Sequence, residues 1–257
     1  MMQIGIKCEF SMQHYERFVN TGYQKNFQAI LREAEYRELH SLFEKTHATF
    51  FAQIMHDDYS FVIAPHTSRY RICVGKNFSK PIRDFDFIVA DPEELPFESN
   101  SLDAILLTHV LEFSKHPQII LKEVYEALSS QGRLYILCFN PWSLWGLAKY
   151  FKPHRLWPWN GKFWSVLRLL KWTRQIGYVP LRTKTFLFHW PTHHRRLHDK
   201  LFFLEPLGQL LYPWMGGISL IVLQKNILSP TGFAYRWRKR MLQTAQGCPN
   251  VSSRRQA

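Results

Sequence analysis

The chain has 257 residues, of which 46% are hydrophobic and 16% aromatic, and its formal net charge is +13. A chain of this length and composition can bury a substantial core, so we expect one main globular domain. Its four cysteines are scattered without a CxxC pair, which argues against a cysteine-based metal site or a disulfide framework. The apolar stretches are too interrupted for a membrane span and the amino terminus lacks the core of a signal peptide, so we predict a cytoplasmic protein without a transmembrane segment.

The first predicted element is a long helical region. We read residues 1–25 as a lead-in and residues 26–225 as the domain. From Asn26 to Met55, apolar residues recur at helical spacing, and a break near Thr46 would divide the region into two helices. We expect this region to cover one face of a sheet.

Two strands are predicted next. Tyr59 to Ala64 is expected to be the first strand of the sheet, followed by the turn Pro65, His66, Thr67 and Ser68. Arg71 to Val74 is expected to be the second strand, and it leads into Gly75, Lys76 and Asn77.

The clearest pattern lies in residues 86–140. Phe87 to Ala90 and Ala104 to Thr108 are short apolar runs of the kind that a parallel sheet buries on both faces. A helix is predicted between His116 and Ser130, ended by Gly132, and a further strand follows. Strand, crossover helix and parallel strand are what a doubly wound sheet requires. Ligands bind beyond the carboxyl ends of such strands, so polar residues there are candidates for a site.

Two motifs carry a family resemblance. The loop DPEELPFESNSLD resembles the D-x-x-x-L-P-F and x-x-x-S-x-D pattern of the class I S-adenosylmethionine-dependent methyltransferases, of the methyltransferase type 11-like group. The segment FNPWSLWGL is similar to the FNPxSxxGL motif of a bacterial branch, the YafS-type methyltransferases. The resemblance implies an α/β, Rossmann-like, doubly wound seven-stranded sheet flanked by helices. The sheet would be mostly parallel, with an antiparallel last strand near Gly217 to Gln224.

The resemblance also implies a cofactor site for S-adenosyl-L-methionine. Asp91 would contact the adenine, with the backbone of Pro92 and Glu93 beside it. The other implied positions lie at the ends of the first, second and fourth strands: Ala64, Pro65, His66, Asn77, Thr108 and His109. The chain departs from the family at two of these ends. The turn after the predicted first strand contains no glycine, and the second strand is not followed by the carboxylate expected to hold the ribose hydroxyls.

Candidate catalytic and substrate residues follow from the same layout. His109 is the best candidate for a base, because a histidine near the transferred methyl group could take a proton from an acceptor at neutral pH. A structural histidine is the alternative. In related methyltransferases the segments around and after the fifth strand shape the acceptor pocket, which here suggests Asn140, Trp142, Trp145, His189 and Trp190. No metal site is predicted.

Charge is distributed unevenly along the chain. Residues 1–145 carry a net charge of −4 and residues 146–257 a net charge of +17. Residues 149–174 interleave bases with aromatics, a mixture suited to nucleic acid or to an anionic membrane surface. An amphipathic helix whose aromatics cover the core is the alternative. Residues 226–257 are expected to be a disordered basic tail, in which the run 236–240 could bind a polyanion.

The sequence therefore predicts an enzyme that transfers a methyl group from S-adenosylmethionine to an unidentified acceptor. One alternative is an inactive methyltransferase-like domain that binds a partner or nucleic acid through its basic half. The other is a peripheral membrane protein acting on a lipid or quinone-like substrate.

Overall fold

A computed structural model of the chain describes residues 22–56, 63–65, 67–76, 85–151, 158–191 and 204–226. His66, Asn77, the basic run 236–240 and nearly all of the predicted lead-in lie outside these residues.

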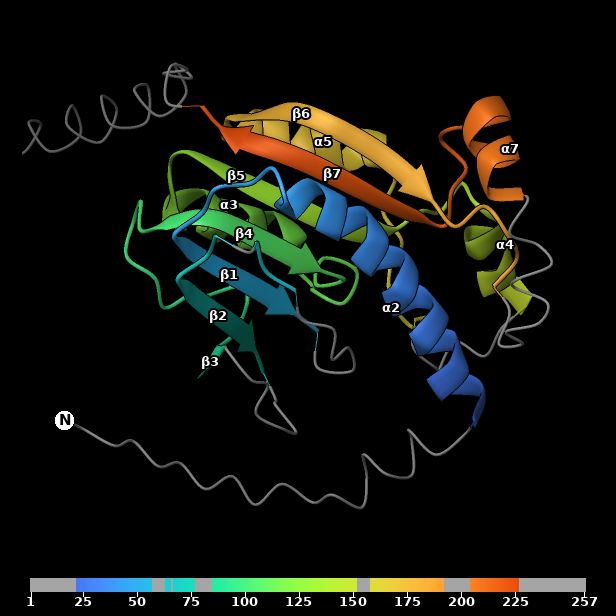
Figure 1. Cartoon of the computed structure of the whole chain (residues 1–257), viewed down its shortest axis with the longest axis horizontal. Coiled ribbons are helices and arrows are strands. Elements are labelled where there is room, and N and C mark those ends of the chain that lie inside the picture. Colours follow the sequence, from blue (N-terminus) through green and yellow to red (C-terminus); the bar gives the residue numbers. More distant parts are fainter. Residues whose placement is uncertain are drawn as a thin grey trace, which may run out of the picture.

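The centre of the fold is one seven-stranded sheet in the order β3-β2-β1-β4-β5-β7-β6 (Figure 1). Neighbours from β3 through β5 are parallel, and β7 is antiparallel to both β5 and β6. The strands are β1 (Phe50–Met55), β2 (Tyr70–Gly75), β3 (Asp86–Val89), β4 (Leu102–Thr108), β5 (Leu128–Phe139), β6 (Tyr178–Phe186) and β7 (Ile218–Lys225). The predicted doubly wound sheet with an antiparallel last strand is confirmed.

Helices cover both faces of the sheet. The helices are α2 (Gly22–Phe43), α3 (Pro117–Ala127), α4 (Leu144–Phe151), α5 (Val166–Ile176) and α7 (Leu204–Leu211). Figure 1 shows α2 crossing one face, α3 and α5 behind the other, and α4 and α7 together at one end. The strands bury residues toward both layers: Phe51 and Leu106 pack in the core beneath α2, whereas Ile54 and Leu107 pack in the core beneath α3. This two-sided burial explains why the strands read as nearly continuous apolar runs.

The prediction of the first strand was wrong. The first strand of the sheet is Phe50–Met55, which pairs with β2 on one side and β4 on the other. The helix that was expected to reach Met55 ends at Phe43, where Thr46 Oγ1 donates to the Leu42 carbonyl oxygen at 2.9 Å. A short apolar run buried on both faces does not show whether it is helix or strand.

The start of β5 also differs from the prediction. α3 ends at Ala127 and β5 begins at Leu128, so Gly132 lies inside the strand and does not end the helix. A Cβ on Gly132 would meet the Ser129 carbonyl oxygen at 2.9 Å. Glycine is therefore required there by a close backbone contact. Within the described ranges, no helix is both long enough and apolar enough to cross a membrane.

Candidate active site

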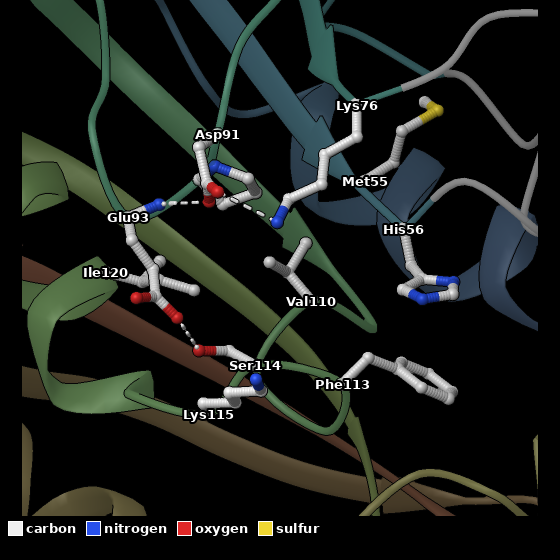
Figure 2. A pocket seen from close by; sticks show the side chains of 11 residues that line it. Met55, His56, Lys76, Asp91, Glu93, Val110, Phe113, Ser114, Lys115 and Ile120 are labelled. Carbon is white, nitrogen blue, oxygen red and sulfur yellow. Dashed lines mark hydrogen bonds and ion pairs between the residues drawn. The ribbon is translucent and has the colours of Figure 1, made fainter.

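A cavity of about 340 Å³ opens where β1 to β4 end. Figure 2 shows the side chains that line it, which come from these strand ends and from the segment leading into α3. They combine apolar walls with charged groups: Met55, His56, Lys76, Asp91, Pro92, Glu93, Val110, Phe113, Ser114, Lys115 and Ile120. A hollow of this size beyond the carboxyl ends of parallel strands is where an open α/β sheet binds a ligand.

Asp91 stands in this cavity with both carboxylate oxygens engaged (Figure 2). Its Oδ1 accepts a hydrogen bond from the Glu93 backbone N–H at 3.1 Å, and its Oδ2 lies 2.8 Å from the Lys76 ammonium. The hydrogen bond from Lys76, then that from the Glu93 backbone, holds the pKa of Asp91 below its usual range. Asp91 is therefore ionised at neutral pH, and its half-exposed side chain contributes little to folding stability.

Lys76 directly follows β2, at the strand end where the resemblance implies a carboxylate. Sequence reasoning identified the missing carboxylate but missed the ion pair with Asp91, because the two residues come from different strands. Asn77, a predicted cofactor-binding position, lies outside the described residues.

Glu93 joins the loop after β3 to the start of α3. Its Oε1 accepts hydrogen bonds from Ser114 Oγ at 2.7 Å and from the His116 backbone N–H at 3.3 Å (Figure 2). These bonds fix the loop that carries Asp91 and Pro92 to the segment that leads into α3. Asp91, Pro92 and Glu93 thus lie together where the sequence placed them, and their binding of a cofactor stays a prediction.

The end of β1 differs from the sequence prediction. Met55 and His56 line the cavity, and the His56 ring lies 4.0 Å from the Phe113 ring, centroid to centroid. Ala64 and Pro65, predicted as the cofactor turn, do not line the cavity, because the strand they were expected to follow lies earlier in the chain. His56 directly follows β1, and residues 57–62 lie outside the described residues.

Thr108 ends β4 but does not line the cavity. It is fully buried, and its Oγ1 accepts a hydrogen bond from Gln53 Nε2 at 3.0 Å. Gln53 Oε1 in turn accepts a hydrogen bond from the Ile63 backbone N–H at 3.0 Å. This chain of bonds ties β4 to β1 and to the segment before β2, so its visible role is structural.

His109 lies in the core, and both of its ring nitrogens are paired. Nε2 lies 2.7 Å from Glu35 Oε1, Nδ1 lies 3.1 Å from Glu112 Oε1, and the ring stacks on Phe139. Burial acts to lower the pKa of His109, but the Glu35 charge and the hydrogen bonds with Glu112 and Glu35 outweigh it and raise the pKa to about 9. An imidazolium held this way cannot accept a proton at neutral pH, so this geometry favours the structural alternative for His109.

One contact of the cluster formed by His109, Glu35 and Glu112 has a signal in the sequence. Glu112 lies three residues after His109, a spacing at which side chains can meet on a helical turn. Glu35 had no such signal, because it lies 74 residues away on α2.

The FNPWSLWGL motif forms a tightly bonded turn between β5 and α4. Asn140 Oδ1 accepts a hydrogen bond from the Trp142 backbone N–H at 3.1 Å, and Ser143 Oγ donates to the Asn140 carbonyl oxygen at 2.7 Å. A Cβ on Gly146 would come within 2.0 Å of the Pro141 carbonyl oxygen. The hydrogen bonds of Asn140 and Ser143 and the close approach at Gly146 therefore give these motif residues a role in stabilising the turn.

The five predicted acceptor-pocket residues do not line the 340 Å³ cavity. Asn140, Trp145 and His189 are buried, and Trp145 Nε1 donates to the His189 carbonyl oxygen at 3.0 Å. His189 also borders a small hollow of about 60 Å³ between α2 and α7. Trp142 and Trp190 are exposed. The structure buries three of these residues and joins Trp145 to His189, and the role of all five in acceptor binding stays a prediction.

Several aromatic side chains of residues 149–174 pack in the interior of the fold. Trp159 and Trp164 are buried, and Lys162 Nζ lies 4.6 Å from the Trp164 ring centroid. Lys149 Nζ donates to the Gly161 carbonyl oxygen and lies 4.6 Å from the Phe163 ring centroid. Much of the pattern of alternating bases and aromatics therefore reflects bases that cover core aromatics. Binding of a polyanion by this stretch stays a prediction.

Sequence comparisons match the region around the cavity. A family model described as a methyltransferase domain matches residues 48–136. YafS, an uncharacterised protein of Escherichia coli strain K12, is 30% identical over 146 residues, which are 56% of this chain and 57% of YafS. The ubiquinone/menaquinone biosynthesis C-methyltransferase UbiE of Rhizobium meliloti strain 1021 is 37% identical over 57 residues, which are 22% of each chain. The chain thus matches little more than half the length of YafS and less of UbiE.

Solved structures share the fold. A SAM-dependent methyltransferase from Thermotoga maritima superposes with a TM-score of 0.59 at 18% identity, covering 84% of this chain and 100% of that one. A SAM-dependent methyltransferase from Archaeoglobus fulgidus superposes with a TM-score of 0.51 at 14% identity, with the same coverage. Residues 48–136 thus match a methyltransferase domain, and the sheet has the fold of solved S-adenosylmethionine-dependent methyltransferases.

Proposed function

We propose that the protein is a methyltransferase that binds S-adenosylmethionine in the 340 Å³ cavity. The observation that carries the proposal is the position of the turn formed by Asp91, Pro92 and Glu93. This turn follows β3 and faces the cavity beside the ends of β1 and β2, in a sheet with the family's strand order.

The lining has the chemistry that an adenosine group requires. An ionised Asp91 can accept a hydrogen bond from the adenine amino group, and Met55, Val110 and Ile120 offer apolar surface for the ring. The residues present therefore fit the cofactor.

When bound, the cofactor would supply an electrophilic methyl group for transfer to a nucleophilic acceptor. The protein would contribute mainly the relative position of the two reactants, which can supply much of a rate enhancement. The acceptor and the cytoplasmic location remain predictions. Nucleic-acid binding through the basic half is likewise a prediction.

A second candidate function has one specific observation in its favour. Lys76 stands in place of the ribose-binding carboxylate and pairs with Asp91, so an incoming cofactor would compete with an existing ion pair. This arrangement suits a methyltransferase-like domain that has lost tight cofactor binding and acts through its basic half, residues 146–257, with a net charge of +17.

Calorimetric titration with S-adenosylmethionine and its demethylated product separates the two candidates. We expect binding, and we expect Asp91→Ala to weaken it by about tenfold to a hundredfold, as for one lost hydrogen bond to a charged group. Asp86→Ala is the matched control, because Asp86 lies at the opposite end of the same strand and outside the cavity. No binding by the wild type, or equal losses in both variants, would reject the proposed site.

A further inference from the structure

Lys76 places a positive charge at the end of β2, inside the cavity that lies beyond the strand ends (Figure 2). In doubly wound sheets that bind adenosine ligands, a side chain about twenty residues after the first turn lies beside the ribose. Lys76 has this position relative to the end of β1 at Met55. A carboxylate there binds a free ribose hydroxyl, whereas a cationic side chain accommodates a phosphate on the ribose. The charge of Lys76 therefore favours the phosphorylated form.

The backbone on either side of this position is fixed. β2 pairs with β3 in parallel, with Gly75 opposite Val89, and the Ala90 backbone N–H donates to the Gly75 carbonyl oxygen at 3.2 Å. Lys76 directly follows Gly75, and Asp91 directly follows Ala90. The two charged side chains therefore enter the same part of the cavity, where Lys76 Nζ lies 2.8 Å from Asp91 Oδ2.

A ligand can replace this ion pair at little cost. The side chain of Lys76 is 56% exposed and that of Asp91 is 47% exposed, so water screens the pair and it contributes little to stability. A hydrogen bond from an ammonium to a phosphate is charge-assisted, and it becomes stronger where the ligand displaces water. A ligand that offers an anion to Lys76 and a hydrogen-bond donor to Asp91 therefore gives each side chain a new partner.

We propose that the cavity binds an adenosine that carries a phosphate group on the 2′ or the 3′ oxygen of its ribose. The phosphate pairs with Lys76, and the adenine amino group donates to Asp91. This placement of the base rests on the proposed function. S-adenosylmethionine offers the same amino group but has free ribose hydroxyls, so its ribose brings no anion to Lys76. The phosphorylated nucleoside would therefore compete with S-adenosylmethionine for the adenosine position.

The test is calorimetric titration of the full chain with adenosine and with its 2′-, 3′- and 5′-monophosphates. We expect the 2′ or the 3′ isomer to bind about tenfold more tightly than adenosine, as for a hydrogen bond between charged groups. The 5′ isomer is the matched control, because it has the same charge but carries the phosphate at the opposite side of the ribose ring. It should bind less tightly than the better of the other two isomers.

Two lysine variants separate a specific contact from a general effect of charge. Lys76→Met keeps a long side chain without the ammonium, so it should abolish the preference for the 2′ or 3′ isomer over the 5′ isomer. Lys115→Met removes a charge from the same cavity, but Lys115 precedes α3 and does not follow β2. The preference should therefore persist in Lys115→Met.

Three outcomes would overturn the proposal. The first is a wild type that binds none of the monophosphates, and the second is a wild type without a preference for the 2′ or 3′ isomer over the 5′ isomer. The third is a preference that Lys76→Met retains. The wild-type comparison decides by itself if Lys76→Met does not fold.

Titration with S-adenosylmethionine tests the proposed function separately. Binding of the 2′ or 3′ isomer without binding of S-adenosylmethionine would reject the proposed cofactor and support the phosphorylated ligand. Binding of S-adenosylmethionine together with equal affinities for the three isomers would reject the phosphorylated ligand alone.

Discussion

The imidazole of His109 and the carboxylate of Glu35 form a fully buried ion pair with 2.7 Å between Nε2 and Oε1. The pair joins the residue after β4 to the helix that covers the sheet, across 74 positions of sequence. Glu112 holds the other ring nitrogen and also accepts a hydrogen bond from the Phe139 backbone N–H at 2.8 Å. His109 adopts a positive φ of 52°, which is uncommon for a residue other than glycine. This cluster therefore locks α2, β4 and β5 together through one charged ring.

The buried cluster predicts a pH dependence of stability. The pKa of His109 is raised from 6.5 to about 9 in the folded protein, so between these values the folded state holds a proton that the unfolded chain releases. The free energy of unfolding should be highest below pH 6.5 and fall as pH rises through about 9, by about 1.4 kcal/mol per pH unit at most. Urea unfolding across this range measures it.

His109→Gln is the control for that dependence. Glutamine can still hydrogen-bond but carries no proton that titrates in this range. The variant should be less stable at neutral pH, and its stability should change less between pH 6.5 and 9. A wild-type profile that rises with pH over this window, or one that the substitution leaves unchanged, would contradict a charged His109.

Lys76→Asp should strengthen the binding of S-adenosylmethionine. The substitution breaks the pair with Asp91 and supplies a carboxylate at the end of β2, where the family holds the ribose hydroxyls. We expect a gain of about tenfold, as for a hydrogen bond to a charged acceptor. Lys76→Met removes the charge alone and separates the two effects, and Lys115→Asp controls for a general change of charge in the cavity. Weaker binding by both Lys76 variants would mean that Lys76 itself contacts the cofactor.

His56→Gly should also strengthen cofactor binding, since His56 directly follows β1 and lines the cavity. Glycine would let the backbone approach the ligand. One additional backbone hydrogen bond, worth about 1 kcal/mol, corresponds to about fivefold in affinity. Pro65→Gly is the matched control and should have no effect, because Pro65 does not line the cavity. Calorimetry that finds the gain in Pro65→Gly instead would return the cofactor turn to its position in the sequence prediction.

Gly146→Ala should destabilise the fold by about 1 to 3 kcal/mol through overpacking. The added Cβ would come within 2.0 Å of the Pro141 carbonyl oxygen, which is backbone and cannot move aside cheaply. Leu147→Ala, at the next and half-exposed position of α4, should cost much less. Urea unfolding of the two variants gives the comparison, and equal losses would show that the turn relaxes around the new side chain.

The local sequence pattern was sufficient to predict an element where polar residues or a proline mark its end or its start. β3, β4 and α3 were predicted because apolar runs end at polar residues, as at Asp91, or begin at a proline, as at Pro117. The loop from Asp91 to Glu93 was placed beside the sheet edge for the same reason. β1 was misplaced because no glycine or proline separates Phe43 from Phe50, so a buried strand continued a helical pattern without a visible break.

The interactions at the site depend on tertiary contacts that no local pattern contains. Lys76 and Asp91 follow different strands, and their pairing requires the register of β2 against β3. The partner of His109 on α2 depends on which helix covers this face of the sheet. Sequence reasoning therefore located the edge that carries the site but not the charges that meet there.

The position of β7 gives the chain an order in which the sheet can be completed. Among the residues that the structure describes, β6 pairs only with β7, which separates it from β5. During synthesis β6 emerges before β7, so until Ile218–Lys225 has left the ribosome β6 has no strand to pair with and β5 keeps an open edge. Open strand edges on nascent chains are templates for aggregation. A chain that stops short of Ile218 would lack β7, and β6 would then have no strand to pair with. Its exposed β5 edge would make it a target for chaperones and proteases.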